Sequence, residues 1–156
     1  MSSLSDIQDF LAQKRIAVVG VGRKPNDFNH RMFQSFRESG YDAVPVNPNA
    51  KEVGGTPCFS CIQEIDPPVD AVLIMTPPGT TDTIAKDCVD AGVKRVWMYR
   101  ASSYDAGAVS PAAVELCQKH GIRVVDHGCP YMFLPKSSWF HHFHGFLLKI
   151  TGNYPK

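Results

Sequence analysis

The sequence lacks the features that would place it in several specialised classes. Its 156 residues carry a net charge of +1, so no excess of positive charge indicates nucleic-acid binding. No stretch is apolar over the roughly 20 residues that a membrane-spanning helix needs, and the first residues lack the cationic and apolar regions of a secretory signal. The five cysteines are odd in number and lack the spacing of a disulfide framework. We therefore expect a cytoplasmic protein with reduced thiols that binds neither nucleic acid nor membrane.

What the sequence does contain is an alternation of short apolar runs and helical patterns. The apolar runs predict five strands, over residues 15–20, 42–46, 69–75, 95–99 and 122–125. Helical spacing and capping signals predict helices over residues 28–39, 80–91 and 110–120, with a weak short helix over 59–65. This alternation predicts an α/β fold, a doubly wound Rossmann-like parallel sheet of about five strands between two layers of helices.

Two of the predicted strands have distinctive compositions. Pro45 lies inside the second strand, which favours a place near the edge of the sheet, or a strand that lacks ladder hydrogen bonds there, because proline has no N–H to donate. Residues 69–75 are almost continuously apolar, as in a parallel strand that is covered on both faces. We predict the strand order 3-2-1-4-5, with a crevice over the carboxyl ends of the first and fourth strands.

The last part of the chain departs from the alternation. From Trp139 to Ile150, aromatic and aliphatic residues recur at helical spacing, with histidines among the polar positions. We predict a domain over residues 1–134, followed by an amphipathic C-terminal helix and tail over 135–156. That helix is expected to pack on the domain or on a second copy of the chain, as in a homodimer.

The loop after the first strand predicts a phosphate-binding site. Two glycines allow a tight turn whose backbone N–H groups face an anion, and two cations follow at the N-terminal end of the next helix. The residues of this loop are Gly20, Val21, Gly22, Arg23 and Lys24. A structural turn with exposed basic residues remains the alternative.

The same region does not complete the fingerprint of a dinucleotide site. Pro25 occupies the position of the third glycine in that fingerprint. Asn47 and Pro48 follow the second strand, where a dinucleotide site would have an acidic residue for the ribose. NAD is therefore disfavoured, whereas a different nucleotide is not.

Residues after the remaining strands extend the predicted crevice. Thr76, Pro77 and Pro78 follow the third strand in a rigid loop without a backbone donor at either proline. Such a loop forms a flat apolar wall that suits an adenine or a pantetheine arm. Arg100 follows the fourth strand, and Cys129 with Pro130 follows the fifth.

Taken together, these motifs carry a family resemblance. They are Ala17-Val-Val-Gly20 with Pro25, Pro45-Val-Asn-Pro48, Val96-Trp97-Met98, and Asp126 with Cys129-Pro130. In this order and spacing the chain resembles the stand-alone coenzyme A-binding proteins, a family similar to the coenzyme A-binding domain of the α subunit of succinyl-CoA synthetase. The resemblance runs from about Asp6 to Pro130, which is most of the chain.

The resemblance implies that coenzyme A or an acyl-CoA lies across the strand ends. By position, the loop of residues 20–24 would take the diphosphate. The corner at Asn47 and Pro48 would flank the adenosine end, and residues 76–78 would line the opposite side. Cys129 would lie near the thiol end of the pantetheine.

We predict a protein that binds coenzyme A without catalysis of its own. By resemblance, the synthetase needs a phosphorylated histidine on a separate domain, and no histidine of this chain can be matched to it. A thiol mechanism at Cys129 stays open, although an unreactive cysteine beside the ligand is favoured. Cys58 and Cys61 have the spacing of half a zinc site, but no second pair follows, so we predict no metal site.

Two other functions remain open at this point. One is an NAD(P)-dependent oxidoreductase or a nucleotide-sensing redox protein with an unusual loop. The other is a partner-dependent subunit of an acyl-CoA ligase. Tighter binding of NAD(P) than of coenzyme A would favour the first, and activity only with an added nucleotide-binding subunit would favour the second.

Overall fold

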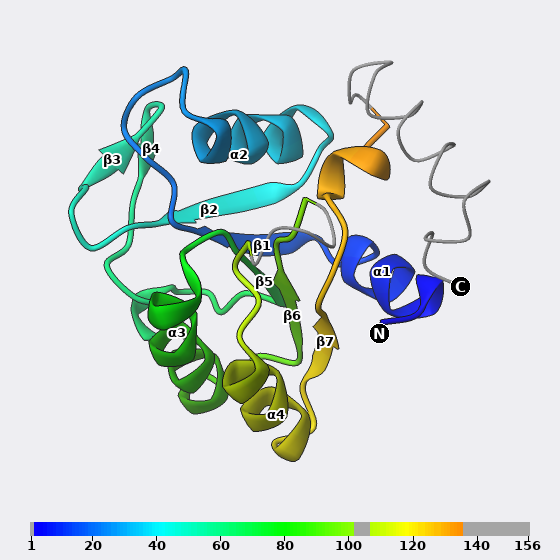
Figure 1. Cartoon of the computed structure of the whole chain (residues 1–156). Coiled ribbons are helices and arrows are strands. Elements are labelled where there is room, and N and C mark those ends of the chain that lie inside the picture. The colour runs from blue at the N-terminus through cyan, green and yellow to red at the C-terminus, as the bar shows by residue number, and fades with distance from the viewer. Residues whose placement is uncertain (1, 102–106, 136–156) are drawn as a thin grey trace.

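Parallel strands form the centre of the computed structural model, which describes residues 2–101 and 107–135 (Figure 1). The strands of this sheet are Arg15–Val19 (β1), Asp42–Val46 (β2), Ala71–Ile74 (β5), Arg95–Met98 (β6) and Arg123–Val125 (β7). All adjacent pairs are parallel, in the order β2-β1-β5-β6-β7. The predicted α/β class and the five predicted strands are therefore confirmed.

The predicted strand order is wrong, and the error moves the expected crevice. Counted along the chain, the parallel strands lie in the order 2-1-3-4-5, because β5 pairs directly with β1. All residues of β5 are 0% exposed, as expected for a central strand with helices on both faces of the sheet. Strand β2, which contains Pro45, lies at the edge of the sheet. From β1 the chain adds β2 on one side of the sheet, and it then adds β5, β6 and β7 on the other side. The order of strands therefore reverses between β1 and β5. The crevice of this topology therefore lies over the carboxyl ends of these two strands.

Helices cover both faces of the sheet (Figure 1). One face packs against α1 (Leu4–Leu11) and α2 (Phe28–Glu38), and the other against α3 (Pro78–Asp90) and α4 (Pro111–Lys119). Residues of β1 alternate between the two cores: Ile16 and Val18 belong to the first, Ala17 and Val19 to the second. The helices predicted over 28–39, 80–91 and 110–120 are confirmed, with ends shifted by at most two residues.

Helix α1 has no counterpart among the predicted elements, although its start is a capping box. The N–H of Asp6 donates to the hydroxyl of Ser3 at 3.2 Å, and the N–H of Ser3 donates to the carboxylate of Asp6 at 2.9 Å. Ile7 and Phe10 of this helix are buried in the first core.

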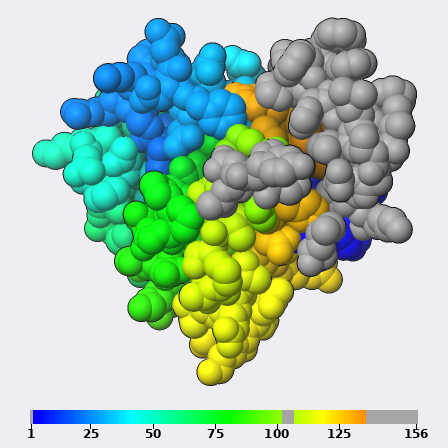
Figure 2. All heavy atoms as spheres, in the orientation of Figure 1, coloured from blue at the N-terminus to red at the C-terminus, as the bar shows by residue number. Residues whose placement is uncertain are grey.

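A short hairpin also lies outside the predicted elements. Glu52–Val53 (β3) and Thr56–Pro57 (β4) pair in antiparallel fashion around two glycines with positive φ. The guanidinium of Arg37 on α2 donates to the hydroxyl of Thr56 at 2.8 Å, which holds the hairpin beside α2 (Figure 2). Two 3-10 turns complete the described chain, Ile62–Glu64 (η1) within the predicted short helix and Pro130–Met132 (η2) after β7. The predicted C-terminal helix over 135–156 lies, apart from Pro135, outside the described residues.

Candidate functional site

The loops after β1 and β5 are joined at the carboxyl edge of the sheet. The side-chain amide of Asn29, in the first turn of α2, donates to the carbonyl of Gly20 at 2.9 Å and to the carbonyl of Met75 at 3.1 Å. Gly20 has a φ of 91°, and a Cβ at this position would lie 3.0 Å from Cγ2 of Thr76. A glycine is therefore required where the two loops meet.

Three successive carbonyls of the β1 loop (residues 20–24) are held by side-chain donors. Asn29 holds the carbonyl of Gly20, the amide of Asn47 donates to the carbonyl of Val21 at 2.8 Å, and Nδ1 of His30 lies 2.9 Å from the carbonyl of Gly22. Because a carbonyl can only accept, Nδ1 of His30 carries the proton in this contact. The donors come from α2 and from the end of β2, so the loop is fixed from two elements.

This arrangement directs backbone N–H groups away from the three donors. In a trans peptide the N–H points opposite to the C=O of the same unit. The peptide bonds of this loop are trans, because the cis bond among the described residues is at Asp66-Pro67. The N–H groups of Val21, Gly22 and Arg23 belong to the three held peptide units. None of them has a hydrogen-bond acceptor among the described residues. Val21 is 0% exposed, so the N–H groups that can reach a ligand are those of Gly22 and Arg23. A loop of this kind can hold an anion with preformed donors.

The charge around the β1 loop favours the same ligand class. Arg23 and Lys24 are exposed, and neither forms an ion pair with another residue in the described ranges. Helix α2 begins at Phe28, and the side chain of Asp27 at its N-cap makes no capping hydrogen bond. The first-turn N–H groups and the positive end of the helix dipole therefore remain available near the loop.

The corner after β2 supports the β1 loop. The amide of Asn47 is committed to Val21, and its carbonyl oxygen accepts from the N–H of Asn49 at 2.9 Å. Asn47 therefore positions the β1 loop. Pro48 beside it is exposed. That this corner flanks an adenosine stays a prediction.

The loop after β5 enters α3 directly. Pro77 is the N-cap of α3 and Pro78 its first residue, while the carbonyls of Thr76 and Pro77 accept from the buried hydroxyl of Thr81 at 3.4 and 3.3 Å. The segment is thus fixed at both ends by β5 and α3. Its proposed part as an apolar wall remains a prediction.

Aromatic rings connect the start of α2 to the residues that follow β6 and β7. The ring of Phe28, at the start of α2, lies 5.4 Å from that of Tyr99 and 5.8 Å from that of Tyr131, measured between centroids. Arg100 is half-buried just after Tyr99, and Pro130 is buried at the start of η2. The structure therefore brings the predicted residues after β1, β6 and β7 to one edge of the sheet.

Cys129 lies at this edge, but its thiol belongs to the core. It is 7% exposed and belongs to the first core. Burial raises the pKa of the Cys129 thiol to about 11 and outweighs the hydrogen bonds from the backbone of Tyr131 and the side chain of Tyr99. At neutral pH the thiol is therefore protonated, a poor nucleophile.

We expect Cys129 to resist alkylation in the folded protein. Iodoacetamide at pH 7.5 should label the half-buried Cys61 first and reach Cys129 only after denaturation, because the reagent needs an accessible thiolate. Peptide mass mapping over time measures both rates. Equal rates at the two thiols before denaturation would contradict the burial of Cys129.

Asn29 and His30 are the site residues that sequence reasoning missed. His30 is 4% exposed, and Nε2 of its ring lies 3.4 Å from the amide nitrogen of Gln34. The only local signal is a pair of polar residues in the first turn of the helix that follows a glycine loop. That signal does not predict that the side chains of Asn29 and His30 donate hydrogen bonds to the carbonyls of the β1 loop.

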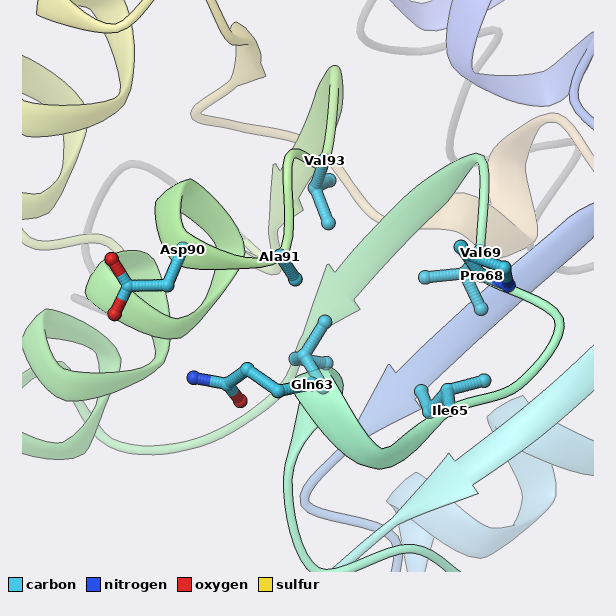
Figure 3. Close-up of a pocket in the computed structure, with 8 residues that line it drawn as sticks. Gln63, Ile65, Pro68, Val69, Asp90, Ala91 and Val93 are labelled. Carbon is cyan, nitrogen blue, oxygen red and sulfur yellow. The ribbon is translucent and has the colours of Figure 1, made fainter.

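A pocket of about 170 Å³ lies at the other edge of the sheet (Figure 3). It is lined by Ile62, Gln63, Ile65, Pro68, Val69, Asp90, Ala91 and Val93. Val69 precedes β5 and Val93 precedes β6, so the pocket lies at the amino ends of these strands. Open parallel sheets bind their ligands beyond the carboxyl ends, so this pocket is distinct from the candidate site.

Within residues 2–101 and 107–135, no group of three or more histidine, cysteine or acidic side chains could hold a metal ion. The half-buried Cys58 and Cys61 therefore gain no further ligand there. In the same ranges, no helix has both the length and the apolar character needed to cross a bilayer.

Comparisons with known proteins agree with this fold. A family model described as a CoA binding domain matches residues 14–135. The chain is 27% identical over 128 residues to the uncharacterized protein YneT of Bacillus subtilis. This alignment covers 81% of this chain and 90% of that protein. It is also 27% identical over 125 residues to the alpha subunit of ADP-forming acetate–CoA ligase II of Pyrococcus furiosus, over 77% of this chain and 27% of the subunit. The chain thus spans about a quarter of that subunit's length.

Solved structures show the same architecture. A hypothetical protein from Pyrococcus horikoshii superposes with a TM-score of 0.74 at 24% identity, over 83% of this chain and 87% of that protein. The dinucleotide-forming acetyl-coenzyme A synthetase 1 of Ca. Korarchaeum cryptofilum gives a TM-score of 0.62 at 25% identity, over 71% of this chain and 25% of the synthetase.

Proposed function

The chain belongs to the CoA binding domain family, and on this premise we propose that it binds coenzyme A or an acyl-CoA through the β1 loop. One observation carries the proposal: the carbonyls of Gly20, Val21 and Gly22 are all held by side chains, and the N–H groups of Gly22 and Arg23, which are not buried, have no acceptor among the described residues. A diphosphate supplies several acceptor oxygens, so it matches such a row of donors.

The residues around the loop fit coenzyme A in charge as well. The ligand carries a diphosphate and a further phosphate on its ribose, and Arg23 and Lys24 place two exposed cations at the loop. Charge-assisted hydrogen bonds from such side chains are stronger than neutral ones. The end of β2 offers Asn47, whose amide holds Val21, and no carboxylate for a ribose hydroxyl. The missing carboxylate disfavours NAD as the ligand.

We propose a binding role without catalysis by this chain alone. The cysteine nearest to the predicted thiol end is Cys129, whose buried thiol is protonated at neutral pH. An acyl transfer through this thiol would first require its deprotonation in an apolar environment, which is costly. The ligand would therefore be bound and released chemically unchanged.

Isothermal titration calorimetry of the purified protein tests this function. We expect saturable binding of coenzyme A, with a lower Kd than that of NAD⁺ or NADP⁺ under the same conditions. Acetyl-CoA in a parallel titration shows whether an acyl group adds affinity. A lower Kd for NAD⁺ or NADP⁺ than for coenzyme A would overturn the proposal.

A second candidate function follows from the likeness to the acetate–CoA ligase subunit. The chain covers 27% of that subunit, so it could serve as the coenzyme A-binding part of a larger ligase. Coenzyme A, acetate and ATP would then react only when a nucleotide-binding subunit is added. Release of ADP by the mixture, and by neither component alone, would favour this candidate.

A further inference from the structure

A carboxylate lies directly against the β1 loop. Asp27 is exposed at the N-cap of α2, and a Cβ added to Gly22 would lie 2.5 Å from its Oδ2. The carboxylate thus covers the side of Gly22 on which any other residue would carry its side chain. An alanine at position 22 would force the carboxylate to move.

This carboxylate is not neutralised by its neighbours. An aspartate at an N-cap commonly accepts from first-turn N–H groups, but the side chain of Asp27 makes no such bond. The backbone N–H of Asp27 donates to the carbonyl of Lys24 at 3.0 Å, which closes a turn and holds the residue beside the loop. Across the described residues, neither Arg23, Lys24 nor any other cation forms an ion pair with it.

We propose that Asp27 sets the affinity of the β1 loop by opposing any anion that binds there. The inference rests on the proposed function, because it assumes that the open N–H groups of Gly22 and Arg23 receive a phosphate. A free anion gains only the loop contacts, and the nearby carboxylate offsets part of that gain. A ligand with further contacts along the strand ends retains enough binding energy to occupy the loop. Asp27 thereby lowers the affinity of the loop for every anion, so that only a ligand with such further contacts binds it tightly.

Calorimetry with inorganic pyrophosphate and with coenzyme A tests the inference. Asp27→Asn removes the charge and keeps the shape, and we expect about 3- to 10-fold tighter binding of both ligands at low salt, with a smaller gain at high salt. Glu115→Gln is the matched control, since Glu115 is an exposed acid of α4 on the opposite face of the sheet. This control should leave both affinities unchanged.

Amide NMR separates failure of this inference from failure of the proposed function. Pyrophosphate should shift the N–H signals of Gly22 and Arg23 in the native protein and in Asp27→Asn. Shifts at these amides with equal affinities of the two proteins would overturn the part assigned to Asp27 alone. If these amides do not respond to pyrophosphate or coenzyme A in either protein, both proposals fail.

Discussion

Replacing both Arg23 and Lys24 with alanine is expected to weaken the binding of coenzyme A by about 1–3 kcal/mol, or roughly 5- to 150-fold in Kd. Both side chains are exposed and without ion-pair partners among the described residues, so their removal should leave the fold intact. The loss should come from charge-assisted hydrogen bonds to the phosphates. Calorimetry with coenzyme A at two salt concentrations measures it, and the native protein should show the steeper salt dependence.

A matched double variant controls for the loss of positive charge. Lys94 and Lys119 are exposed, and they lie before β6 and at the end of α4. Their joint replacement with alanine changes the net charge equally, and we expect the affinity for coenzyme A to stay close to that of the native protein. If the variant at positions 23 and 24 also binds with native affinity, the β1 loop is not the phosphate site.

The second large effect is expected at Asn29. Asn29→Ala removes both hydrogen bonds that join the loops after β1 and β5, and it leaves the carbonyls of Gly20 and Met75 without this donor. We expect the free energy of unfolding to fall by about 1–3 kcal/mol, because unpaired polar groups at a partly buried site are costly. Coenzyme A should bind more weakly as well, since the β1 loop loses one of its three fixed carbonyls. Urea denaturation and calorimetry measure the two effects.

Asn26 provides the control for this variant. It lies in the same connection between β1 and α2, is exposed, and forms no side-chain hydrogen bond with any residue of the described ranges. Asn26→Ala should therefore change neither stability nor affinity appreciably. Equal effects of the two substitutions would mean that Asn29 does not fix the loop.

The fold class was predictable because its signals are local. Apolar runs such as residues 69–75 mark strands wherever they occur, and glycines after helical patterns mark the helix ends. Strand order is a property of pairing between distant segments, and the predicted order was wrong. Two features of the sequence argue against the predicted order, which placed the second strand between the first and the third. Pro45 suits the second strand to the edge of the sheet, and the continuously apolar third strand suits a central position, as β2 and β5 have in the structure.

The candidate site was predictable in its residue types but not in its construction. Glycines followed by cations at a strand end indicate an anion loop from sequence alone. The hydrogen bonds that shape this loop join residues far apart: Asn47 is 26 positions from Val21, and Asn29 is 46 positions from Met75. No local pattern reports such contacts. Similarly, the burial of Cys129 results from tertiary packing, which the Cys-Pro pair in the sequence does not report.

A crystal structure of the protein with coenzyme A tests the central claim most directly. The claim is that the held carbonyls of the β1 loop present the N–H groups of Gly22 and Arg23 to the diphosphate. The expected result is diphosphate oxygens within hydrogen-bond distance of these two N–H groups, with the carbonyl contacts of Asn29, Asn47 and His30 unchanged. A diphosphate bound elsewhere, with the two N–H groups facing only solvent, would contradict the account.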